Sequence, residues 1–241
     1  MPAPRPWTVL PHKPWEKLSE NVWTVSAALH RGALQRRMTV LKRADGRLVV
    51  HSAACLDDAS MRALEAWGEP AFIVVPNGFH RLDAHAWKAR YAAAKVLCPK
   101  DVAAAVAKVV AVDGHYEDLP SDAGVSVSPL AGIHPRLGEG VFSARDAAGL
   151  GVLVFCDALF NHAHMSGFQG WVVKTMGSTG GPRVTPLMRM VGVRDRAALA
   201  GHLRQLAESP GLAALVPGHG DVVAQAASDT LGTVANDLHS A

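Results

Sequence analysis

The 241-residue sequence lacks several features that would place it in a specialised class of protein. It contains no run of about 18 apolar residues, so we expect no membrane-spanning helix. It has three cysteines and no Cys-x-x-Cys pair, which argues against a disulfide framework and favours buried thiols in a reducing compartment. Its N-terminus has no apolar core of the signal-peptide type, so we expect a cytoplasmic protein.

Charge is sparse as well. Charged residues make up 19% of the chain, and the formal net charge is +3. The basic residues are scattered, which argues against a nucleic-acid partner and favours a solvated surface. Hydrophobic residues make up 49% of the chain, so we expect one domain over residues 1–241 with an irregular lead-in over residues 1–20. The composition does not predict the oligomeric state.

Short apolar runs bounded by turn residues predict strands, and longer periodic stretches predict helices. Strands are expected at 22–26, 38–42, 47–50, 71–75, 95–98, 125–128, 140–143, 151–155 and 212–216. Helices are expected at 59–67, 82–91, 101–110, 197–208 and 222–239, and 161–186 is expected to be a long loop. The pair Asp45-Gly46 predicts a hairpin turn. An early hairpin followed by alternating strands and helices predicts mixed sheets covered by helices, which is an α/β class.

Twelve histidines are many for this length, and several stand at the ends of apolar runs, which points to a metal site. His219 stands in Pro-Gly-His-Gly, directly after the strand expected at 212–216. The glycines allow a sharp turn and the close approach of a ligand to the imidazole. A glycine-rich turn with an incidental histidine explains this pattern equally well.

Two further positions are candidates for the same site. Asp157 ends an apolar run and is expected at the carboxyl edge of a sheet, where ligands bind in α/β folds; a helix N-cap is the alternative. His134 lies in Gly-Ile-His-Pro before a predicted strand, and a loop with an incidental histidine is its alternative. His162 and His164 would share one face of a strand, but a plain loop is the favoured interpretation there.

Together, the three positions resemble the second half of the metallo-β-lactamase superfamily. That family has a Gly-His loop, an apolar strand ending in Gly-Asp-(Ala)-Leu-Phe, and a Pro-Gly-His-Gly turn near the C-terminus. These features map to His134, Asp157 and His219, and the resemblance spans about residues 20–225. It implies a four-layer αββα sandwich, with two mixed β-sheets flanked by helices.

The chain departs from that family at its hallmark, His-x-His-x-Asp-His, which supplies ligands for a pair of metal ions. In the corresponding stretch, Asn77 stands at the position of the first histidine and Phe79 at that of the second. His80 follows, and Asp83 comes three residues later, so the two share a helix face if the helix starts early. The sequence leaves open whether this stretch is a disabled site or a rebuilt one.

The resemblance implies that His134, Asp157 and His219 are candidate ligands of one divalent metal ion, zinc first, with iron or manganese as alternatives. His80 is the fourth candidate, because it lies three residues beyond Asn77 and can reach the cavity from the turn. Asp157 and His219 are then catalytic, His219 alternatively as an acid toward the leaving group. Asp83 is a candidate proton shuttle or ligand. A pair of metal ions is an alternative and would need Asp83 or His85 as a further ligand. The absence of any metal is also open, with the histidines as hydrogen-bonded relics of the fold. Asp157 would then need another partner, because unpaired buried charge is costly.

These assignments lead to two main functional hypotheses. The first is a metal-dependent hydrolase acting on a small-molecule ester, thioester, lactone or phosphoester, in which the metal lowers the pKa of water to about 7 and polarises the oxygen under attack. The second is a binding module that has kept the fold, lost the metal, and holds a small ligand or a protein. A flavin-linked oxidoreductase of the superfamily would need a flavodoxin-type domain, for which the chain is too short.

Overall fold

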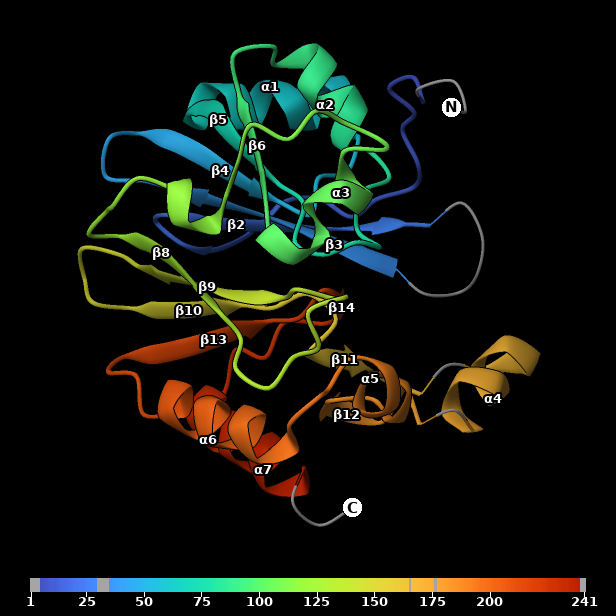
Figure 1. Ribbon diagram of the computed structural model, residues 1–241. Helices are drawn as coiled ribbons and strands as arrows, with labels where there is room; N and C mark the ends of the chain where they lie inside the picture. The colour runs from blue at the N-terminus through green and yellow to red at the C-terminus, as the bar shows by residue number, and fades with distance from the viewer. Residues whose placement is uncertain (1–4, 30–34, 165, 176, 239–241) are drawn as a thin grey trace.

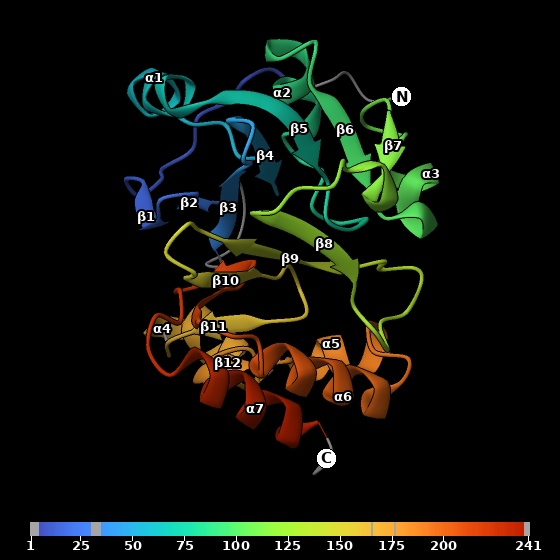
Figure 2. The same cartoon turned by 90° about the vertical axis from the view of Figure 1, so that its left-hand side faces the viewer.

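The computed structural model describes residues 5–29, 35–164, 166–175 and 177–238 of the chain. Two main β-sheets lie face to face between two layers of helices (Figures 1 and 2). In Figure 1, α1, α2 and α3 cover one sheet, and α6 and α7 cover the other. This arrangement confirms the predicted αββα fold class. Within the described residues, no helix is long and apolar enough to cross a membrane.

The first sheet is mixed and contains seven strands in sequence order. They are β1 (Glu16–Ser19), β2 (Val22–Ala28), β3 (Gln35–Lys42), β4 (Arg47–His51), β5 (Glu69–Val74), β6 (Lys95–Cys98) and β7 (Gly114–His115). Strands β1 to β4 pair antiparallel, and β4 to β7 pair parallel. The predicted hairpin joins β3 to β4. Its turn contains Gly46 at a φ of 81°, a left-handed conformation that glycine adopts without strain.

The second sheet has four strands in the order β13-β10-β9-β8. They are β8 (Val125–Pro129), β9 (Gly140–Arg145), β10 (Gly151–Val154) and β13 (Leu212–Val216). β10 pairs antiparallel with β9 and parallel with β13, so this sheet is also mixed. Apolar side chains from both sheets meet between them, including Val49, Phe72, Phe142 and Val154.

A third, small sheet was not predicted. Its order is β12-β11-β14, and its strands are β11 (Phe160–His162), β12 (Gly181–Arg183) and β14 (His219–Gly220). The expected long loop at 161–186 is therefore wrong, because it contains β12, most of β11 and the helix α4 (Gly167–Thr175). Strands of two or three residues are too short to show the alternation by which strands are recognised. The backbone N–H of Arg37 in β3 donates to the carbonyl of Gly218 at 2.8 Å, which ties this sheet to the first.

The remaining helices follow the sequence prediction with two corrections, except that the helix at Pro186–Val191 was not predicted. They are α1 (Asp58–Trp67), α2 (Ala84–Arg90), α3 (Ala103–Val106), α5 (Pro186–Val191), α6 (Arg196–Ala207) and α7 (Ala227–Asp237). The helix expected at 101–110 is only the short α3 after a 3-10 turn, because β-branched valines disfavour helix and Val109 N–H bonds back to Val106 at 2.8 Å. α7 begins late because Leu215 and Val223 exchange backbone hydrogen bonds at 2.9 Å, which keeps the chain extended there.

The core and the cysteines fit this architecture. The helices α1 and α2 bury Leu64 and Trp87 in one core cluster, and α6 and α7 bury Leu203 and Leu231 in another. All three cysteines are buried and unpaired, as expected. With both sheet faces filled, polar groups gather where β5 and β10 end, at one edge of the sandwich.

Candidate functional site

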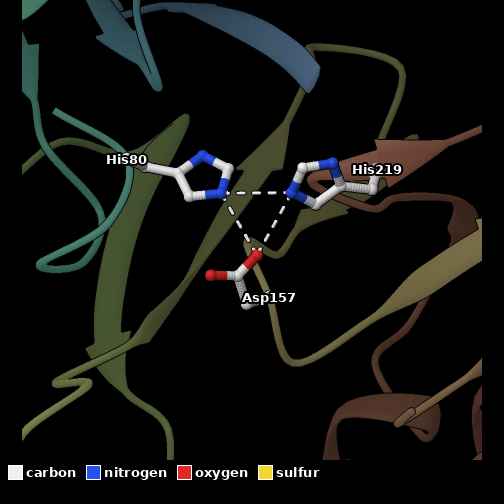
Figure 3. Close-up of side chains that lie close together, drawn as sticks. All are labelled: His80, Asp157 and His219. Atoms are coloured by element: carbon white, nitrogen blue, oxygen red, sulfur yellow. Dashed lines mark hydrogen bonds and ion pairs between the residues drawn. The ribbon is translucent and has the colours of Figure 1, made fainter. Parts of the chain in front are cut away.

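Three predicted ligands meet at that edge (Figure 3). His80 follows β5, Asp157 follows β10, and His219 follows β13 as the first residue of β14. His80 Nε2 lies 3.1 Å from Asp157 Oδ1, His219 Nε2 lies 3.3 Å from the same oxygen, and the two Nε2 atoms are 3.2 Å apart. The three side chains therefore aim one atom each at a common centre.

The protonation of His219 is set by its other ring nitrogen. Nδ1 lies 2.7 Å from the backbone carbonyl oxygen of Gln35, which only accepts, so Nδ1 carries a proton and donates it. In the neutral ring, Nε2 then carries no proton, and its lone pair faces the carboxylate of Asp157 and the imidazole of His80. Electron pairs converging at this distance repel one another unless a cation, either a proton or a metal ion, lies between them.

The donor set fits one metal ion. Ligand atoms that share a tetrahedral zinc ion at ~2.0–2.1 Å are about 3.3 Å apart, and the three separations here match that spacing. Two imidazoles and one carboxylate form a three-residue set with room for a further ligand. His80 is suitably oriented, because its Nδ1 lies 2.9 Å from the hydroxyl of Ser52 and leaves Nε2 for the centre.

Asn77 connects two of these residues. Its side-chain N–H donates to Asp157 Oδ2 at 2.7 Å, which leaves Oδ1 facing the centre. Its Oδ1 accepts from the backbone N–H groups of Phe79 at 2.8 Å and His80 at 3.0 Å. Asn77 is fully buried, so these bonds are shielded from water. Asn77 therefore holds Asp157 and the backbone before His80 in place.

Glu139 is a site residue that the sequence analysis missed. Its buried carboxylate accepts from the backbone N–H groups of Cys156, Asp157 and Ala158 at 2.8–3.0 Å. Burial and the nearby charge of Asp157 raise the pKa of Glu139 to about 8, against the opposing effect of these donors. No motif marks this residue, because a glutamate between two glycines resembles any exposed turn.

The pKa of Asp157 is held well below its ordinary range. Burial alone would raise it, but the positive charge of a protonated His80 and the hydrogen bonds that protonated His219 and His80 donate outweigh that effect, so here a proton takes the place of the central cation. The shift favours the ionised carboxylate, which is the form that can bind a metal ion. The contacts with His80 and His219 also stabilise this buried charge, for which the sequence indicated no partner with certainty.

His134 is not part of this group. Its Nδ1 accepts from the backbone N–H of Arg136 at 3.1 Å, within its own loop. Its backbone N–H donates to Gly192 at 2.7 Å, which anchors the loop at the end of α5 instead of at a strand end. The structure thus brings together three of the four predicted ligands.

Asp83 also lies apart from the three ligand atoms. α2 begins at Ala84, so His80 precedes the helix and the two side chains do not share a helix face. The buried Asp83 carboxylate forms an ion pair with Arg36 and accepts from the backbone N–H of Cys55 at 2.9 Å. Its predicted role as shuttle or ligand gains no geometric support, because these partners occupy it.

A cleft opens over the three side chains. Its volume is about 300 Å³, and it is lined by Leu29, Arg36, Phe79, His80, Leu82, Asp157 and His219. A larger hollow of about 510 Å³ lies at the opposite end of the strands, beside the β3–β4 turn, and contains none of the three. Of the paired histidines His162 and His164, neither lines the cleft; His164 bonds to Thr179 at 2.9 Å.

The chain is similar to known proteins in its three-dimensional structure and not in its sequence. No sequence-family profile matches the chain, and no curated protein matches it by sequence. The DIM-1 metallo-β-lactamase, exposed to ceftazidime, matches with a TM-score of 0.61 and 14% identity over 95% of this chain and 99% of that one. A metallo-β-lactamase from Erythrobacter litoralis, with β-mercaptoethanol in its active site, matches with a TM-score of 0.60 and 14% identity over 92% and 96%.

A third solved structure shows the same similarity over almost the whole chain. FIM-1 from Pseudomonas aeruginosa, in its mono-zinc form, matches with a TM-score of 0.58 and 12% identity over 98% of this chain and 97% of that one. Identities this low establish the architecture and leave the activity to be argued from the site. The architecture itself agrees over almost the whole length of each chain. The chain therefore has the metallo-β-lactamase fold.

Proposed function

We propose that this protein is a metal-dependent hydrolase that uses one divalent metal ion, zinc first, held by His80, Asp157 and His219. The triangle of two Nε2 atoms and one carboxylate oxygen, 3.1–3.3 Å apart, supports this most directly. Because His219 carries its proton on Nδ1, the neutral arrangement favours a cation at the centre. Three protein ligands with one open position are typical of catalytic zinc.

The chain would orient this centre through its own hydrogen bonds. When bound, a metal ion supplies Lewis acidity and makes water a nucleophile near neutral pH. Ser52 and the Gln35 carbonyl hold the two imidazoles by their Nδ1 atoms, so that each Nε2 points inward. Asn77 holds the outer oxygen of Asp157 and leaves the inner one to bind.

A single ion suits the described residues better than a pair. Asn77 and Phe79 stand where the family carries two histidines; the Asn77 amide is fully engaged and Phe79 offers no donor. Asp83 is held by Arg36, and His134 bonds within its own loop. Two histidines and one carboxylate also suit iron(II), so the metal has to be identified directly.

The test compares turnover by the metal-reconstituted wild-type protein and by a His219→Ala variant on four substrates: an ester, a thioester, a lactone and a phosphoester. We expect turnover of at least one class, abolished by chelation and lower by at least about 100-fold in His219→Ala. His202→Ala is the matched control, because His202 lies on α6 and bonds to Ala131. A metal-loaded protein that turns over none of the four would contradict the proposal and favour the binding module.

A further inference from the structure

The walls of the cleft over the three proposed ligands are mainly apolar. Apart from His80, Asp157 and His219, it is lined by four residues, and three of these are apolar: Leu29, Phe79 and Leu82. Leu29 follows β2, and the other two lie between β5 and α2. A volume of about 300 Å³ is at the small end of the ~300–1,000 Å³ typical of small-molecule sites.

The side chains of the apolar wall are exposed to solvent, and the backbone that carries Phe79 is held by hydrogen bonds. Phe79 is 72% exposed and Leu82 is 40% exposed, and both rank among the large apolar side chains left open to solvent. The backbone N–H of Phe79 donates to the buried Asn77 at 2.8 Å, and His80 bonds to the same oxygen. The ring therefore stands one residue from a proposed metal ligand, on a backbone fixed by the same contact. Apolar surface in such a place favours a ligand that covers it.

The cleft has no unpaired cation among its described lining residues. Arg36 is the only arginine or lysine there, and its guanidinium forms an ion pair with Asp83, with both side chains buried. It also donates to the carbonyl of Ala53 at 3.2 Å. Recognition of a phosphate or carboxylate normally uses a free cationic group, often a bidentate arginine. The Nε of Arg36 has no partner but is buried out of reach of solvent. The described lining residues therefore offer no exposed cationic group for an anionic substrate.

We infer that the substrate is a neutral carboxylic ester or lactone with a hydrocarbon chain that lies on Phe79 and Leu82. The inference rests on the proposed hydrolase function and narrows its four substrate classes. Hydrolysis breaks the acyl C–O bond; the hydroxyl of water joins the acyl carbon, and its remaining proton goes to the leaving oxygen. Each CH₂ that becomes buried on the wall contributes up to about fourfold to kcat/KM.

The test measures kcat/KM of the zinc-loaded full chain on two ester series. The p-nitrophenyl esters of acetate, butyrate and hexanoate lengthen the acyl side, and methyl, butyl and hexyl acetate lengthen the alcohol side. We expect at least one series to rise by about tenfold or more from its shortest to its longest member. We also expect kcat/KM for p-nitrophenyl phosphate to be lower than kcat/KM for the hexanoate by about 100-fold or more.

Two variants locate the effect. Phe79→Ser should reduce the ratio of kcat/KM between the longest and shortest ester to less than about threefold. Met190→Ala removes an equally exposed apolar side chain, 74% exposed on α5 and outside the cleft, and should leave the ratio unchanged. A ratio that stays high in Phe79→Ser, or a phosphate ester that reacts as fast as the hexanoate, would overturn the inference.

Binding of unreactive ketones separates this inference from the hydrolase proposal. Acetone and octan-2-one are compared by ligand-observed NMR on the wild-type protein and on Phe79→Ser. No turnover, together with octan-2-one binding that Phe79→Ser abolishes, would refute the hydrolase and support the apolar site. Turnover with flat ester series and no preference for octan-2-one would support the hydrolase and overturn the apolar site.

Discussion

Asn77 provides the sharpest test of how the site is held together. Replacement by alanine removes its bond to the Asp157 carboxylate at 2.7 Å and its bonds from the backbone N–H groups of Phe79 and His80 at 2.8 and 3.0 Å. All three involve a fully buried side chain. Loss of Asn77 should therefore affect both the stability of the fold and the position of two proposed ligands.

The expected loss of stability follows from these three bonds. A neutral hydrogen bond contributes about 1 kcal/mol net and one to a charged group about 1.5–3 kcal/mol, so Asn77→Ala should lower the free energy of unfolding by about 4 kcal/mol. For a domain of this length, that corresponds to a decrease in Tm of about 8–16 °C. Asn77→Asp keeps the acceptor but places a second carboxylate beside Asp157, and it should destabilise at least as much.

Urea denaturation of the metal-free protein measures the effect without a contribution from bound metal. Asn21→Ala is the matched control. Asn21 Nδ2 donates to the Arg145 carbonyl at 3.0 Å and its Oδ1 accepts from the Ser19 hydroxyl at 2.9 Å, and loss of these two bonds near the surface should lower the free energy of unfolding by no more than about 2 kcal/mol. An Asn77→Ala variant within about 1 kcal/mol of wild type would refute the reasoning.

Three further predictions concern neighbouring residues. Burial lowers the pKa of His51 from 6.5 to about 3, so between these values only the unfolded state takes up the proton as the pH falls. The free energy of unfolding should therefore decrease below pH 6.5, by up to about 3 kcal/mol at pH 4.5. Urea titrations at several pH values should show that a His51→Leu variant loses this dependence. Ser52 has a φ of 57°, which glycine adopts more easily than alanine, so the free energy of unfolding of Ser52→Gly should be about 1 kcal/mol higher than that of Ser52→Ala. Both variants remove the hydroxyl that holds His80, so zinc titration should show about 10–100-fold weaker binding to both. Asp83→Asn leaves the charge of Arg36 buried without its partner and should cost about 3–5 kcal/mol in the same denaturation assay; an unchanged midpoint would count against that ion pair.

The main sheets could be predicted because their strands carry a strong local signal. The apolar runs at β5 and β10 and the hairpin at Asp45-Gly46 each depend on residues close together in the chain. The small third sheet carries no such signal, because β11, β12 and β14 are two or three residues long. Its pairing depends on contacts between distant segments.

The site was predictable only in part, for the same reason. Asp157 and His219 follow apolar strands, so their place at the sheet edge could be inferred. Asn77 was recognised only as a missing histidine, because its role depends on distances to Asp157 and to the backbone. His134 matched a family loop in sequence, yet that loop is anchored to α5. Glu139 gave no sequence signal at all.

The central claim is that three residues, without His134, hold one metal ion. Plasma mass spectrometry of tag-free protein, dialysed after incubation with zinc, iron(II) and manganese, measures it most directly in the wild type and in His219→Ala and His134→Ala variants. The account predicts about one equivalent in the wild type and in His134→Ala, and far less in His219→Ala. Negligible metal in the wild type, or metal that depends on His134 and is indifferent to His219, would contradict it.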